Sequence, residues 1–251
     1  MGKFAVKGDG CQATDQSIIH LMNKIDVSLE IGPKRTFASA VDWPGWCRIG
    51  RDEQTALQAL LDYGPRYERI VRPAARRNEV LRFLAPEGLS AFVVVERVEG
   101  NSTTDFGAPN VPLSRDEMPV DDAAHQRFEN LLKACWQAFD EAVRHATGKE
   151  LRKGPRGGGR DLEGIVRHVL GGDAGYLSQL GWKFKREKTD SLEEELRQTR
   201  QAILEGLAAA VRGELPAQGP RGGARWKPPT FIRRVAWHVL DHVWEIEARI
   251  L

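Results

Sequence analysis

The spacing of the apolar residues changes once along the chain, and this change is the strongest constraint on the fold. Over residues 25–31, in the run Ile-Asp-Val-Ser-Leu-Glu-Ile, apolar side chains occupy alternate positions. Such alternation buries one face of a β-strand. After residue 120 the apolar residues recur at the three- and four-residue spacing of amphipathic helices. The sequence therefore predicts an α+β protein, with a sheet before the change and helices after it.

The first 100 residues predict a tail followed by a β-β-β-α-β unit. Residues 1–24 are mixed and aperiodic, and we interpret them as a tail. Turn residues at 32–34 and 42–47 separate three short strands. Asp52 can cap a helix, and the apolar run 91–98 predicts a last strand. The unit spans residues 25–100.

The remaining sequence predicts a linker and a bundle. Residues 101–120 are rich in Pro, Gly, Ser, Thr and Asn, which is typical of a linker. Residues 121–251 contain four amphipathic segments, the first with a capping Asp and the fourth opening on Pro-Pro-Thr, and we expect them to form a four-helix bundle. The interior of such a bundle can hold a cofactor. We place the expected helices at 121–148, 161–180, 191–212 and 228–251.

Composition narrows the classes of partner. The 251 residues contain 37 Lys and Arg against 35 Asp and Glu, a net charge of +2. This balance disfavours nucleic acid or an anionic membrane as the partner of the whole chain. The chain also lacks an apolar run of transmembrane length and a secretory leader, so we expect a cytoplasmic protein. Its three cysteines (Cys11, Cys47 and Cys135) show no metal-binding spacing, so any metal would be held by histidine.

Three histidines have the placement of metal ligands. His238 and His242 are four residues apart in the last predicted helix, and helical geometry points both the same way. Apolar residues bracket the pair, which indicates that it faces inward. His168 lies in the apolar stripe of the second predicted helix. A divalent ion would satisfy three buried imidazoles together, whereas a single buried histidine is more often a hydrogen-bonded structural residue.

The bundle sequence resembles a known superfamily. His168 is followed five residues on by Asp173, and the chain ends with the His238 and His242 pair in Ala-Trp-His-Val-Leu-Asp-His-Val-Trp-Glu. In these features residues 121–251 resemble the DinB-like superfamily, which includes bacillithiol and mycothiol S-transferases. The resemblance implies a three-histidine site with open positions for water or a thiolate. It implies zinc first, with nickel or iron as alternatives, and a low-molecular-weight thiol as a possible co-substrate.

The first unit resembles another family. The turn Asp-Trp-Pro-Gly-Trp at 42–46 and the helix start Arg-Asp-Glu-Gln-Thr-Ala-Leu at 51–57 are similar to those of the HicB-like antitoxin fold. The resemblance implies a surface for dimerisation or for a protein partner, and no chemistry.

Other polar residues could support the site. Asp173, Asp241 and Glu245 could accept hydrogen bonds from imidazole N–H groups, although Asp241 and Glu245 could equally be solvated. A seven-residue sequence, Gly-Pro-Arg-Gly-Gly-Gly-Arg at 154–160, recurs with one change at 219–225. Its arginines could bind the anionic end of a thiol or substrate, or the loops could simply connect helices. The candidate anion-binding residues are Arg156, Arg160, Arg221 and Arg225.

Two functions follow as expectations. The first is a metal-dependent transferase or hydrolase that activates a thiol or water and takes a small anionic thiol or substrate. The second is a non-catalytic metal-binding protein whose HicB-like unit forms a homodimer or recruits a partner.

Overall fold

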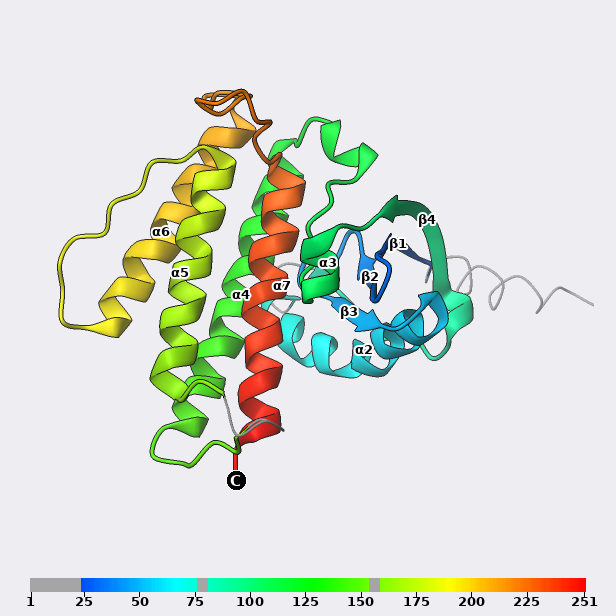
Figure 1. Ribbon diagram of the computed structural model, residues 1–251, viewed down its shortest axis with the longest axis horizontal. Helices are drawn as coiled ribbons and strands as arrows, with labels where there is room; N and C mark the ends of the chain where they lie inside the picture. Colours follow the sequence, from blue (N-terminus) through cyan, green and yellow to red (C-terminus); the bar gives the residue numbers. More distant parts are fainter. Residues whose placement is uncertain (1–23, 76–80, 154–158) are drawn as a thin grey trace, which may run out of the picture.

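The computed structural model describes residues 24–75, 81–153 and 159–251. A four-stranded sheet comes first in the chain and long helices follow it, so the predicted α+β class is confirmed. Figure 1 shows the sheet beside the four long helices, with the last helix, α7 (Pro228–Arg249), next to the sheet. The expected tail lies outside the described residues except for Lys24.

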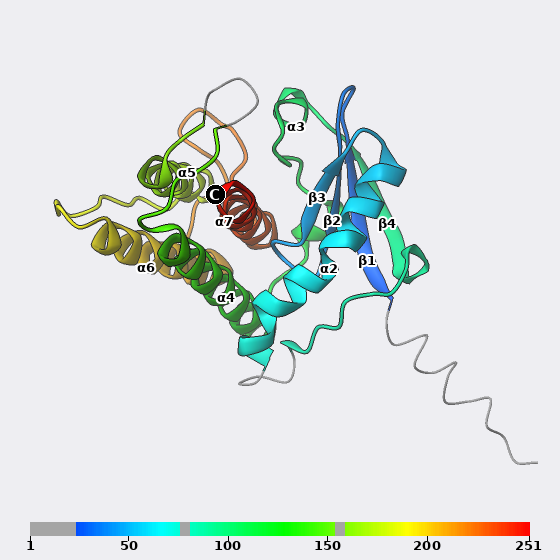
Figure 2. The same ribbon diagram turned by 90° about the horizontal axis from the view of Figure 1, so that it is seen from below.

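The sheet has the strand order β3-β2-β1-β4. Strand β1 is antiparallel to β2 and parallel to β4, and β2 is antiparallel to β3. A parallel return requires a crossover connection, which contains helix α2. Figure 2 shows α2 running along the sheet and ending beside the first helix of the bundle, α4. The bounds are β1 Ile25–Ile31, β2 Thr36–Ala40, β3 Cys47–Gly50, α2 Glu53–Ala75 and β4 Phe92–Glu99.

The turn between β2 and β3 is held from two sides. Trp46 Nε1 donates a hydrogen bond to the Leu60 carbonyl oxygen of α2, and the Tyr67 hydroxyl donates to the Pro44 carbonyl oxygen, both at 2.9 Å. Gly45 has a φ of 94°, and a Cβ on it would lie 2.8 Å from Leu240 of α7. The turn therefore needs glycine at this position, and it joins the sheet unit to the last helix.

The segment expected to be a linker, 101–120, contains two short helical elements and buried anchors. They are α3 (Ser102–Phe106) and a 3₁₀ turn (Ser114–Glu117). The backbone N–H of Asn110 donates to the Glu30 carboxylate of β1 at 2.9 Å. Asp116 is buried, accepts a hydrogen bond from Thr230 at 2.6 Å and pairs with Arg233. The segment thus binds both the sheet and α7.

The four long helices begin close to the predicted positions, because capping residues start the first three and Pro228 starts the fourth. Asp121, Asp161 and Ser191 each accept a hydrogen bond from a backbone N–H in the first turn of their helix. Helix α7 packs against α4 and α5. Among the described residues, no helix combines the length and apolar character needed to cross a membrane. The bounds are α4 Asp122–Ala146, α5 Leu162–Leu180, α6 Leu192–Val211 and α7 Pro228–Arg249.

Candidate metal centre

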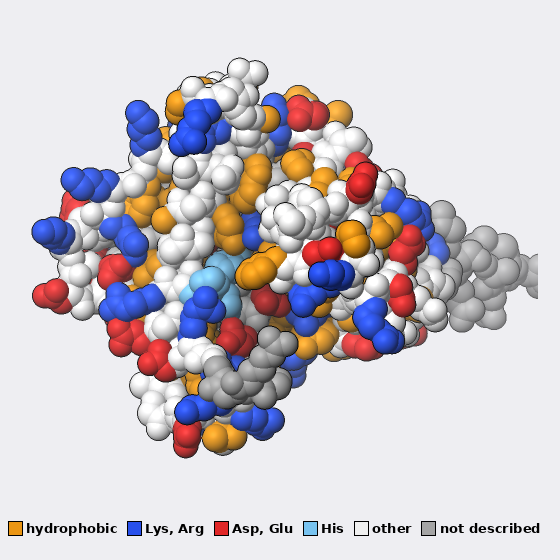
Figure 3. All heavy atoms as spheres, viewed as in Figure 1, with side chains coloured by type: hydrophobic (Ala, Val, Ile, Leu, Met, Phe, Trp, Pro, Cys, Tyr) orange, Lys and Arg blue, Asp and Glu red, His pale blue; other side chains and the backbone are white. Residues whose placement is uncertain are grey.

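Three histidines from two helices meet between α5 and α7. His168 lies on α5, and His238 and His242 lie one turn apart on α7. His238 and His242 are only 5% and 7% exposed, whereas His168 is partly open to solvent. Figure 3 shows histidine surface on the face of the molecule that carries these two helices. The cluster can therefore be reached from one side.

The ring nitrogens point toward a common centre. Nε2 of His238 lies 3.3 Å from Nε2 of His168 and 3.3 Å from Nε2 of His242. One ligand atom from each ring falls within 4.8 Å of the other two. Two imidazole nitrogens on one tetrahedral zinc, each at roughly 2.0–2.1 Å, would lie about 3.3 Å apart. The two distances therefore match the spacing that a shared zinc ion requires.

The protonation states favour metal binding. Burial, together with the neighbouring His242 and His168, lowers the pKa of His238 to about 2. Burial and the charge of Arg160 also lower the pKa of His168. Both rings are therefore neutral near pH 7, so their nitrogen lone pairs are available as ligands.

A chain of polar contacts orients His242. Its Nδ1 lies 2.7 Å from Oε2 of Glu245, and Oε1 of the same carboxylate accepts a hydrogen bond from Arg249 at 2.5 Å. Arg249 also donates to the carbonyl oxygens of Arg152 and Arg160. A proton on Nδ1 shared with Glu245 leaves Nε2 with its lone pair directed at the cluster.

The other two predicted supporting acids lie elsewhere. Asp241 pairs with Arg48 of β3 at 3.3 Å, and burial raises its pKa. Asp173 is buried, its Oδ1 has no hydrogen-bond partner among the described residues, and burial raises its pKa to about 7. Within the described part of the chain, Glu245 alone of the three acids contacts a histidine ring nitrogen.

Two residues that the sequence reasoning did not assign to the site shape it. A Cβ on Gly172 would lie 2.5 Å from Cε1 of His238, so glycine allows this ring to approach α5 closely. The Tyr176 ring lies 5.4 Å from that of His238, edge to face. The signal was present as a glycine inside a helical pattern, because glycine costs helix stability there and its lack of a Cβ permits a close approach.

The four arginines of the repeated loops have different positions. Arg156 lies outside the described residues. Arg160 is exposed and close enough to lower the pKa of two of the histidines, whereas Arg221 is exposed in the second loop. Arg225 donates a hydrogen bond to the carbonyl oxygen of Ser178, near the end of α5. Ser178 lies ten residues beyond His168, about 15 Å along the helix, so Arg225 is held away from the histidines, whereas the charge of Arg160 acts on His168 and His238.

The second ring nitrogen of His238, Nδ1, is less well supported than that of His242. This nitrogen is buried and has no hydrogen-bond partner among the described residues. A ligand histidine usually donates the hydrogen on this nitrogen to an acceptor, so the ring of His238 is less firmly oriented than that of His242.

A scan against models of known protein families found no match, nor did searches of the curated proteins and of the solved structures.

Proposed function

We propose that the protein binds one divalent metal ion through His168, His238 and His242 and acts as a metal-dependent transferase or hydrolase. The observation that carries this proposal is the pair of 3.3 Å distances between Nε2 atoms from two helices. Zinc agrees best with these distances and with an all-nitrogen ligand set, and nickel and iron are alternatives. The likeness of the bundle to the DinB-like superfamily and of the sheet unit to the HicB-like fold belongs to the same proposal.

Neighbouring residues orient the histidine rings and leave one side of the cluster accessible. Glu245, held by Arg249, fixes the ring of His242, and Gly172 gives His238 its place against α5. The open side of His168 gives a small molecule a route to the cluster. A divalent ion with three neutral ligands supplies Lewis acidity that makes a thiol or water nucleophilic near pH 7. A low-molecular-weight thiol or water is therefore the proposed nucleophile.

Metal analysis of the purified protein tests the site. We expect about one equivalent of a transition metal in the unaltered protein and a large loss in His238→Ala. His145→Ala is the matched control, because His145 lies on exposed surface of α4 and should leave the metal content unchanged. A metal content well below one equivalent that His238→Ala does not alter would overturn the proposal.

A cobalt-substituted sample separates an enzyme from a structural metal site. If the ion has an open position, 2-mercaptoethanol should change the visible absorption of the cobalt protein saturably. A cobalt spectrum that no thiol and no change of pH perturbs would indicate a closed, structural site and would remove the catalytic part of the proposal.

A further inference from the structure

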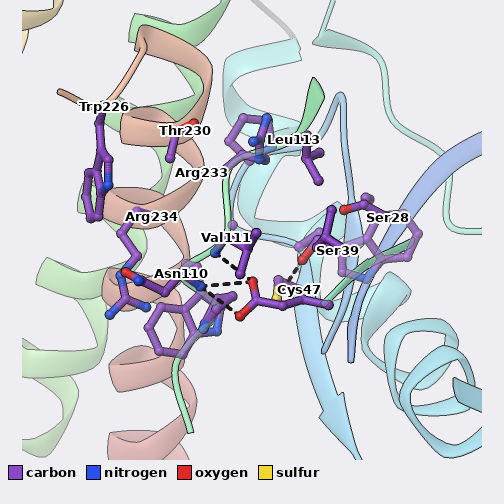
Figure 4. Close-up of a pocket in the computed structure, with 18 residues that line it drawn as sticks. Ser28, Ser39, Cys47, Asn110, Val111, Leu113, Trp226, Thr230, Arg233 and Arg234 are labelled. Carbon is purple, nitrogen blue, oxygen red and sulfur yellow. Dashed lines mark hydrogen bonds between the residues drawn. The ribbon is translucent and has the colours of Figure 1, made fainter. Parts of the chain in front are cut away.

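Helix α7 also carries two polar side chains, Arg233 and Arg234, at its border with the sheet. Between these side chains and the strands lies a narrow cavity of about 50 Å³. Figure 4 shows Trp226, Arg233 and Arg234 on its α7 side and Ser39 and Cys47 on its sheet side. One water molecule needs roughly 10–15 Å³ of such cavity space, so the cavity has room for one small polar group and not for a whole metabolite.

The two adjacent arginines in this cavity differ in their partners. Arg233 pairs with the buried carboxylate of Asp116. Arg234 has no hydrogen-bond partner for Nε or Nη1 among the described residues, and both atoms are buried. Buried N–H groups of a charged side chain that lack acceptors carry a substantial desolvation cost. Burial also lowers the pKa of Arg234, and the nearby Glu30 and Asp241 carboxylates oppose this shift.

The nearby acids are already committed to other groups. Glu30 lines the same cavity, but its carboxylate accepts hydrogen bonds from Thr104 and from the backbone N–H groups of Asn110 and Val111. Asp241, two turns further along α7, pairs with Arg48. Within the described ranges no carboxylate is hydrogen-bonded to Arg234, and the charge of Glu30 acts on it only across the cavity lining.

Aromatic rings restrict how a ligand can reach this cation. The Arg234 guanidinium lies 4.6 Å from the ring centroid of Trp237 and 5.1 Å from that of Tyr176. Both distances lie within the roughly 6 Å at which an aromatic face attracts a cation, and a planar carboxylate matches the hydrogen-bonding edge of a guanidinium. Arg234 also precedes His238 by four residues, so the two side chains leave α7 on nearly the same side, about 6 Å apart along the axis.

We propose that this cavity binds the carboxylate of a small organic acid at Arg234 and that the rest of the molecule extends toward His238. A singly charged carboxylate fits the cavity volume and the Arg234 cation better than a phosphate dianion, because Glu30 contributes a negative charge to the same lining. This inference rests on the proposed function, because the bound acid would be the substrate or thiol of the metal centre. That substrate or thiol would then be a carboxylic acid.

The first test needs no metal. In the full-length ¹⁵N-labelled protein, sodium propionate is titrated while the arginine Nε–H resonances are followed. The Arg234 resonance, assigned by its loss in Arg234→Gln, should shift saturably with propionate and remain still with the neutral propionamide. Equal responses to the two compounds, or none to propionate, would refute carboxylate binding at Arg234. Propionamide serves as a control that does not depend on the folding of any variant.

The second test uses the cobalt-substituted protein with two thiols, 3-mercaptopropionate and 2-mercaptoethanol. The acid should bind at least tenfold more tightly, which is the size expected for a charge-assisted hydrogen-bonded pair. That preference should disappear in Arg234→Gln and persist in Arg197→Gln, whose side chain is exposed on α6. Equal affinity of the unaltered protein for the two thiols would refute the inference and leave the metal site standing. Failure of both thiols to bind would instead refute the proposed function, and the propionate titration would still decide the role of Arg234.

Discussion

Replacing Gly172 by alanine should disturb the metal centre without adding any polar group. The new Cβ would lie 2.5 Å from Cε1 and 2.9 Å from Nδ1 of His238, where ordinary contacts between carbon atoms are about 3.5–4.0 Å. The ring must therefore move by about 1 Å, away from the position that gives the 3.3 Å nitrogen spacing. We expect metal affinity to fall about 10- to 100-fold, the range seen when the support of a ligand is lost.

The neighbouring Gly171 provides the matched control. A Cβ at Gly171 would meet nothing within 4 Å, so Gly171→Ala should add only the helix preference of alanine, about 0.5–1 kcal/mol of stability. In Gly172→Ala the same gain opposes an overpacking cost of about 1–3 kcal/mol. The metal-free variant should therefore range from unchanged to about 2.5 kcal/mol less stable.

Competition with a chromophoric chelator measures the metal affinity of each variant, and urea denaturation of the metal-free protein measures the free energy of unfolding. Metal affinity should differ between the two alanine variants. If Gly172→Ala and Gly171→Ala bind metal equally tightly, the close approach of His238 to α5 is not what positions this ligand.

Two further predictions concern the supporting acids. The pKa of Asp173 is about 7 in the folded protein, against an ordinary value of 3.8, so the folded state holds this proton more tightly than the unfolded state. The resulting stabilisation is complete below about pH 4 and is lost as the pH rises to about 7. Over that interval the stability of the unaltered protein relative to Asp173→Asn should fall by up to about 1.4 kcal/mol per pH unit in urea denaturation, and parallel curves would contradict the shift. Glu245→Gln should weaken metal binding about tenfold in the chelator competition, because it replaces the carboxylate on Nδ1 of His242. An unchanged affinity would show that this contact does not orient the ring.

Much of the candidate site could be predicted because its spacing is local. The four-residue step from His238 to His242 fixes their common direction as soon as the segment is helical, and helix caps such as Asp161 are read directly from neighbouring residues. His168 was harder to place, since its meeting with α7 depends on how two helices pack. The apolar stripe around it predicted an inward direction, and the structure brings it to 3.3 Å from His238.

Other parts depended on partners distant in the sequence. Glu245 and Asp241 are both acids beside the histidines on one helix, yet one contacts His242 and the other pairs with Arg48 from the sheet. The difference arises because α7 lies between the bundle and the sheet, so a small rotation around the helix changes which unit a side chain faces. The sequence of α7 alone does not indicate which of its side chains face the sheet.

The sequence by itself determined the α+β class, the change from strands to helices and the pair of histidines on one helical face, because alternation and helical periodicity act over a few residues. The tertiary structure alone decided that residues 101–120 anchor the sheet to α7 through Glu30 and Asp116. It also decided that Arg233 has an acidic partner while Arg234 has none among the described residues. These two adjacent arginines are chemically identical, and only long-range packing determines which of them meets a buried carboxylate.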